Sequence, residues 1–179
     1  MFIIKSYIKY PNIPVYDLED VEKRPFHYFI DINNSEEILR IKKDLDLDYI
    51  DGVLHLTYNN QVIISFRSYD LIDHLWAYFL NMVEEFLQKK RSEMSFPDQP
   101  TPISMNYISD DYILFSINFT QWTLPKYEFF NALLLGAKDF FEKIMLLIEE
   151  EKDSCMFQLR KIKMLLWSDP VHTLSICPL

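Results

Sequence analysis

Histidine and cysteine are the residues most often found in metal sites and as catalytic nucleophiles or bases, and this chain has few of them. Its four histidines and two cysteines are His27, His55, His74, His172, Cys155 and Cys177. None of the histidines has the H-x-x-x-H or H-E-x-x-H spacing of a metal site, and the serines lack the G-x-S-x-G turn of a catalytic serine. We therefore predict no metal, no cofactor and no catalytic residues, and we interpret Cys155 as a small core residue of a helix.

An acidic run is the densest cluster of metal-ligating side chains. It reads Asp44-Leu45-Asp46-Leu47-Asp48-Tyr49-Ile50-Asp51-Gly52. A calcium-binding EF-hand loop needs glycine at its sixth position and glutamate at its twelfth, and counting from Asp44 these positions hold Tyr49 and His55. The run therefore predicts an exposed helix end that leads into a turn, with a patch for a cation or a basic partner as the alternative. A second acidic run, 149–151, is interpreted as a solvated C-terminal helix end, with a surface feature kept for a partner as the alternative.

The overall charge points to the kind of partner that the protein would bind. Acidic residues outnumber basic ones 27 to 18, which gives a formal net charge of −9. A field of this sign repels the phosphate backbone of nucleic acids and favours basic proteins. The candidate partner-binding residues are one tryptophan and six aspartates: Trp122, Asp98, Asp110, Asp111, Asp44, Asp46 and Asp48.

Two of these candidates lie in expected loops. Asp98 belongs to a proline-rich segment, and stiff loops lose little entropy on binding. Trp122 lies in an expected connection between a strand and a helix, where a large aromatic side chain anchors a partner or, as the alternative, plugs the edge of the core.

Two glycines, Gly52 and Gly136, exclude the glycine-rich loops that bind nucleotides. We expect Gly52 to open a hairpin with a positive φ, and Gly136 to allow a close crossing of another helix, such as the C-terminal one. The apolar N-terminal run is too short for a signal peptide, and the apolar segment 132–137 is too short for a membrane helix. With too few cysteines for a disulfide framework, these features predict a cytoplasmic protein that does not contact membranes.

Hydrophobic periodicity and turn residues predict the elements that must position these side chains. Strands are expected at 2–8 and 26–32, and hairpins at 53–66, turning at Asn59-Asn60, and at 103–119. Helices are expected at 36–46, from an Asp70 cap to 90, from Thr123 or Pro125 to 150, and at 154–167.

A hairpin followed by a long helix occurs twice in this order. We therefore predict an α+β fold, with an antiparallel sheet built from two hairpin–helix (ββα) units and helices packed mainly on one face. We expect a single domain over 1–179, with an N-terminal arm (1–25), a first half (26–90), a proline-rich connector (91–102), a second half (103–167) and an extended tail (168–179).

Three hypotheses for the function follow. The first is a small acidic protein-binding module, in its most concrete form a bacterial immunity or inhibitor protein that neutralises a basic toxin domain. The second is an enzyme with a motif-free active site, using groups such as His55, Asp51 and Asp98; a deep pocket joining a histidine to a carboxylate would favour it. The third is a structural module that forms a homodimer. No motif carries a resemblance to a known family.

Overall fold

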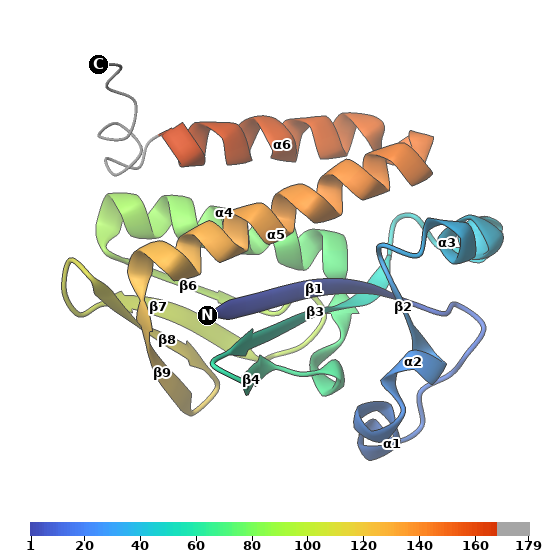
Figure 1. Cartoon of the computed structure of the whole chain (residues 1–179), viewed down its shortest axis with the longest axis horizontal. Coiled ribbons are helices and arrows are strands. Elements are labelled where there is room, and N and C mark those ends of the chain that lie inside the picture. Colours follow the sequence, from blue (N-terminus) through green and yellow to red (C-terminus); the bar gives the residue numbers. More distant parts are fainter. Residues whose placement is uncertain (168–179) are drawn as a thin grey trace.

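The fold combines helices with antiparallel sheets, as predicted. The computed structural model describes residues 1–167, which form two antiparallel sheets with long helices over one face (Figure 1). The α+β class is therefore confirmed. The expectation of an extended tail falls on residues 168–179, which lie outside the described residues.

The first sheet is built around the N-terminal strand. Its order is β2 (Phe29–Asp31), β1 (Phe2–Lys9), β3 (Asp51–Tyr58) and β4 (Gln61–Ile64), with β5 (Asp70–Leu71) paired to β3. Strand β1 pairs with β3 from Phe2, opposite Tyr58, to Ile8, opposite Gly52. Residues 2–9 therefore belong to the sheet rather than to a peripheral arm. Asn59 and Asn60 make the turn between β3 and β4 at φ of 48° and 67°, as the sequence predicts.

The second sheet is a meander of four neighbouring strands. They are β6 (Arg91–Ser95), β7 (Pro102–Tyr107), β8 (Tyr112–Ile117) and β9 (Thr120–Pro125). Two expectations were wrong here. Residues 91–95 of the expected connector form an edge strand, and residues 120–125 form a strand rather than a connection. Each segment pairs with its neighbour along the chain, β6 with β7 and β9 with β8. The two equivalent hairpin–helix units are thus not confirmed.

Six α-helices and three short 3₁₀ turns complete the described residues. They are α1 (Leu18–Lys23), α2 (Pro25–Tyr28), α3 (Ser35–Ile41), η1 (Lys42–Asp44), η2 (Phe66–Ser68), α4 (Ile72–Lys89), α5 (Lys126–Leu147), η3 (Glu149–Glu151) and α6 (Lys152–Trp167). The expected strand at 26–32 was wrong in its first part, because Pro25 starts a short helix there. Asn34 caps α3 as predicted, accepting from the Glu37 N–H at 3.3 Å. Helix α4 begins two residues after Asp70, whose side chain does not cap it.

The long helices form two layers above the sheets. Helix α4 contacts β3 and β6, and α5 contacts β1 and β9, so each helix spans both sheets. Helix α6 lies on α5 as an outer layer (Figure 1). A separate apolar cluster on the other side of β1 and β3 includes Tyr7, Val21, Val53 and Phe66, and it holds α1 against the first sheet.

The central contact of the fold joins α4, α5 and β1. The Trp76 side chain is fully buried, and its Nε1 donates to Ser6 Oγ at 3.0 Å. A Cβ atom at Gly136 would lie 2.7 Å from Trp76 Cη2 and 3.2 Å from Ile4 Cγ2. Gly136 therefore does permit a close approach, as predicted, but to α4 and β1 rather than to the C-terminal helix.

Gly52 is needed for a different reason from the one predicted. It lies inside β3 and has no positive φ, so the expected hairpin turn was wrong. A Cβ atom there would overlap the carbonyl oxygen of Tyr7 and approach Ile72 Cγ2 to 2.8 Å. The residue allows α4 to begin close against the pair formed by β1 and β3.

Gly136→Ala tests the central contact. Alanine in a helix interior is normally more stable than glycine by about 1 kcal/mol. Here the added methyl group overlaps Trp76, so we expect a net loss of about 1–3 kcal/mol in the free energy of unfolding, measured by urea denaturation. Trp76→Phe removes the overlapping ring atoms, and the double variant should therefore lose less than the sum of the two single variants. Additive losses, or a stabilising Gly136→Ala, would contradict this packing.

Candidate functional site

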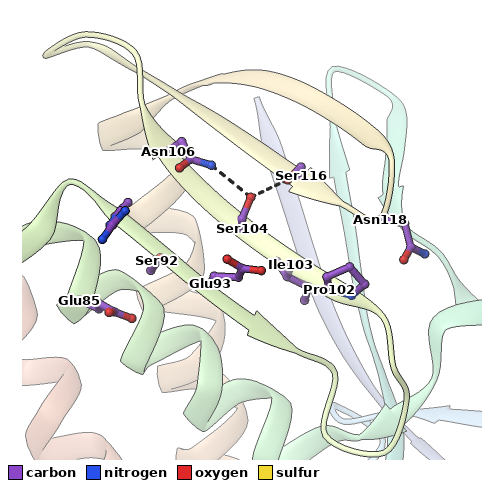
Figure 2. Close-up of a pocket in the computed structure, with 10 residues that line it drawn as sticks. Glu85, Ser92, Glu93, Pro102, Ile103, Ser104, Asn106, Ser116 and Asn118 are labelled. Atoms are coloured by element: carbon purple, nitrogen blue, oxygen red, sulfur yellow. Dashed lines mark hydrogen bonds between the residues drawn. The ribbon is translucent and has the colours of Figure 1, made fainter.

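A polar hollow of about 580 Å³ lies on the second sheet, over β6, β7 and β8 (Figure 2). Ser104 Oγ lies 2.7 Å from Ser116 Oγ, and Asn106 Nδ2 donates to Ser104 Oγ at 3.2 Å. The hollow is lined by Glu85, Arg91, Ser92, Glu93, Pro102, Ile103, Ser104, Asn106, Ser116 and Asn118. The two hydroxyl groups bond to each other, and no histidine or cysteine is among these residues. The surface is therefore polar, without a base that would activate a nucleophile.

A smaller hollow gathers carboxylates from three separate parts of the chain. It measures about 200 Å³ and is lined by Leu47, Asp48, Asp73, His74, Ala77, Phe141, Glu151, Ser154 and Gln158. Asp48 follows η1, Asp73 lies in the first turn of α4, and Glu151 immediately precedes α6. We call this site the acid-lined hollow.

Asp73 is the most enclosed of these carboxylates. Its side chain is 20% exposed, and its Oδ2 lies 3.6 Å from Nε2 of the neighbouring His74. Its Oδ1 is buried without a hydrogen-bond partner among residues 1–167. Burial raises the pKa of Asp73, and the proximity of His74 only partly opposes this shift.

The residues next to Asp73 in the acid-lined hollow are also buried or close to other negative charges. Burial raises the pKa of Glu151, and the nearby charges of Asp73 and Asp48 act in the same direction. The Oε1 atom of Gln158 is buried without a partner in the described part of the chain. Burial, Glu151 and Asp73 also raise the pKa of the Cys155 thiol to about 12. The site is thus rich in hydrogen-bond acceptors and poor in donors, and Cys155 is an unreactive core residue, as predicted.

The acidic runs meet here in a way that the sequence does not reveal. Residues 149–151 form the turn η3, which leads directly into α6. Their interpretation as a C-terminal helix end was therefore incomplete, because the carboxylates also precede a helix N-terminus, where negative charge is favourable. The signal in the sequence was the Glu149-Glu150-Glu151 triplet. Nothing in the sequence links it to Asp73.

The predicted aspartates separate into groups. Asp48 lines the acid-lined hollow, while Asp46 Oδ1 accepts from the Asp48 N–H at 3.1 Å and shapes the same turn. Asp44 Oδ2 lies 3.4 Å from Asn12 Nδ2. Asp110 and Asp111 lie in the hairpin between β7 and β8, at the left of Figure 1, whereas α3 and the start of α6 lie at the right. These five aspartates therefore do not form one continuous patch.

Trp122 lies in β9 and is partly buried against the main core. Its ring packs on Phe115 with the ring centroids 6.1 Å apart, and its Nε1 is buried without a partner among the described residues. These contacts favour the alternative of a plug at the core edge over a partner anchor.

Asp98 lies beside a buried aspartate that fixes the proline-rich loop. Asp70 is 3% exposed, and its Oδ1 accepts from the N–H groups of Leu71 at 2.7 Å and Asp98 at 2.9 Å. Gln99 Nε2 donates to the Tyr69 carbonyl oxygen at 2.6 Å. Burial raises the pKa of Asp70, and the backbone hydrogen bonds only partly oppose the shift. Asp70 is therefore a structural anchor for residues 96–101.

The catalytic set suggested for the enzyme hypothesis is not assembled. His55 packs against Phe66, 4.9 Å between ring centroids, and burial lowers its pKa. Asp51 pairs with Lys9 at 3.2 Å, and Asp98 belongs to the loop anchored by Asp70. The acid-lined hollow does join a histidine to a carboxylate, but its volume is below the ~300–1,000 Å³ of small-molecule sites.

Comparisons with known protein families, curated proteins and solved structures give no match for this chain. Within residues 1–167, no group of three or more histidine, cysteine, aspartate or glutamate side chains is arranged to hold a metal ion. None of the helices in that range has both the length and the apolar character needed to cross a bilayer.

Asp73→Asn tests the electrostatics of the acid-lined hollow. A raised pKa means that the folded state holds the proton more tightly than the unfolded state, so this carboxylate lowers stability as pH rises above the ordinary aspartate range. We expect the free energy of unfolding of Asp73→Asn, relative to the unmodified protein, to improve as pH rises above the ordinary aspartate range and to level off once the folded Asp73 is ionised, measured in urea titrations.

Asp20 provides a control of opposite sign. It accepts from Arg24 Nη2 at 2.6 Å and from the Tyr28 hydroxyl at 2.5 Å, and these bonds lower its pKa to about 2. Its stabilising effect is present above the ordinary aspartate pKa and is lost as pH falls toward 2, so Asp20→Asn should become relatively less stable as pH rises from 2 to 4 and should change little above that. If the free energy of unfolding relative to the unmodified protein changed in the same direction with pH for both variants, burial would not be destabilising the Asp73 carboxylate.

Asp70→Ala tests the anchor of the proline-rich loop. Removing the carboxylate leaves two backbone N–H groups without their acceptor, which costs about 1–3 kcal/mol for buried groups. We expect faster amide hydrogen exchange at Asp98 and Leu71 together with this loss of stability. Asp70→Asn retains an acceptor oxygen and should keep both amides protected. Unchanged exchange in Asp70→Ala would rule out this role.

Proposed function

We propose that this protein is a protein-binding module that recognises a basic partner through the acid-lined hollow. The observation that carries the proposal is the convergence of Asp48, Asp73 and Glu151, with the pKa of Asp73 and of Glu151 raised. Burial raises both pKa values, and no lysine or arginine of the described residues lines the hollow. A cationic side chain from another protein supplies the missing countercharge.

Lysine and arginine fit the chemistry of the site better than other partner groups. Both present several N–H donors, and the hollow offers carboxylate and amide oxygens, including Asp73 Oδ1 and Gln158 Oε1, which lack partners in residues 1–167. Hydrogen bonds between oppositely charged groups are about twice as strong as neutral ones. The volume of about 200 Å³ suits one side chain rather than a folded ligand.

The net charge of −9 supports the same class of partner. Complementary charge speeds encounter between proteins and disfavours wrong partners. We therefore retain the immunity or inhibitor protein, which neutralises a basic toxin domain, as the most concrete form of the proposal. The hollow would receive a lysine or arginine of that domain.

Calorimetric titration against a panel of cationic nuclease and deaminase toxin domains tests the proposal. We expect at least one domain to bind, and the double variant Asp73→Asn/Glu151→Gln to weaken that binding at least tenfold, because two buried charge-assisted contacts are lost. The variant should also bind with a weaker dependence on salt concentration.

A matched control separates the hollow from the overall charge. Glu19→Gln/Glu128→Gln removes the same two negative charges from exposed positions in α1 and α5. It should reduce the association rate slightly and leave the dissociation rate unchanged. Equal weakening by both double variants would contradict recognition at the hollow, and no binding across the panel would contradict the toxin-neutralising form.

A further inference from the structure

Strand β1 has one side that is only partly paired. Strand β2 pairs with Tyr7, Ile8 and Lys9, and the Ile32 N–H donates to the Ser6 carbonyl oxygen at 3.0 Å. No strand among residues 1–167 pairs with residues 2–5 on this side, so the first half of β1 forms an open edge of the sheet (Figure 1).

The existing hydrogen bonds show which backbone groups point outward. The Ser6 carbonyl oxygen and the Tyr10 N–H bond toward the β2 side, whereas the Met1 carbonyl oxygen accepts from Asn59 on the β3 side. Backbone groups alternate in direction along a strand. The N–H and C=O groups of Phe2 and Ile4 therefore face the open edge, while those of Ile3 and Lys5 face β3.

A hollow of about 270 Å³ adjoins this edge. It lies between β1 and α5 and is lined by Phe2, Ile4, Ser6, Ala132, Leu135, Gly136 and Asp139. Leu135 is 49% exposed, and the missing side chain at Gly136 keeps α5 close to Ile4. The edge thus combines free backbone groups with a space lined by aliphatic side chains such as Ile4 and Leu135 and by the polar Ser6 and Asp139. Free backbone groups beside a side-chain pocket are the arrangement used when a peptide adds a strand to a sheet.

We propose that the open edge of β1 binds an extended segment of another protein, which adds a strand beside Phe2–Lys5. One aliphatic side chain of that segment enters the hollow next to Leu135, and its backbone bonds to Ile4. Lysine or arginine residues flank that side chain, because the acceptor carries a net charge of −9. Asp139 beside the hollow is already paired with Lys143 Nζ at 2.6 Å. This inference does not depend on the acid-lined hollow.

A second copy of this chain does not fit the same edge. Neighbouring strands lie about 4.8 Å apart, whereas packed helices need about 8–10 Å between their axes. Helix α5 packs over β1, so pairing two β1 edges would bring two α5 helices too close together. The occupant must therefore be an extended segment with no helix above it.

Amide hydrogen exchange measured by NMR on the full chain tests whether the edge is open. We expect the Ile4 amide to exchange at least a hundredfold faster than the Lys5 amide, because only Lys5 faces β3. Equal protection of the two amides would overturn the proposal. If that protection disappears when residues 168–179 are removed, the chain's own terminus is the occupant, and the proposal fails in the same way.

Peptide binding tests the occupant. The probes are acetylated seven-residue peptides with alternating threonines, a central leucine, isoleucine, valine or phenylalanine, and lysines at both ends. We expect at least one peptide at 1 mM to slow Ile4 exchange at least fivefold. N-methylation of its amides that face β1 should abolish the effect, whereas N-methylation of the alternate amides should not.

Two further results decide the outcome. If none of the four peptides slows exchange at Ile4, the edge is not a strand-binding site and the proposal is overturned. The double variant Asp73→Asn/Glu151→Gln should bind the peptides as the unmodified protein does. If the toxin domains do not bind at the acid-lined hollow, peptide binding at the β1 edge is unaffected. The two proposals can therefore fail separately.

Discussion

The packing of Trp76 is the constraint on which the rest of the structure depends. This side chain extends from α4 and is fully buried, donates to Ser6 of β1, and occupies the space left by the missing side chain of Gly136 in α5. Three elements distant in sequence thus meet at one indole ring. Because α4 and α5 each contact both sheets, fixing their distance from β1 also fixes how the sheets share one core.

The acid-lined hollow is a consequence of this helix arrangement. With α4 held against α5, the first turn of α4 faces the start of α6, and Asp73 comes close to Glu151. The carboxylates are partly removed from water, and residues 1–167 supply no lysine or arginine to the lining. Such a site lowers the stability of the free protein, and binding a cation would recover that loss.

The edge of β1 and the acid-lined hollow have different chemistries but favour the same class of partner. The edge offers backbone groups and a space lined partly by aliphatic side chains, and the acid-lined hollow offers buried acceptors. A basic protein with an extended segment would satisfy both proposals. In the polar hollow on the second sheet, Ser104, Ser116 and Asn106 bond to one another, while the buried Ser92 Oγ has no partner among the described residues.

The sequence by itself determined the features that depend on near neighbours in the chain. Apolar spacing identified α4 and α5, Asn59-Asn60 identified a hairpin turn, and Asn34 identified a helix cap, because each depends on residues within a few positions. Tertiary structure alone decided that β1 pairs with β3, and that Asp48, Asp73 and Glu151 meet. These outcomes depend on contacts between segments far apart in sequence, and no local pattern specifies which distant segment becomes the neighbour.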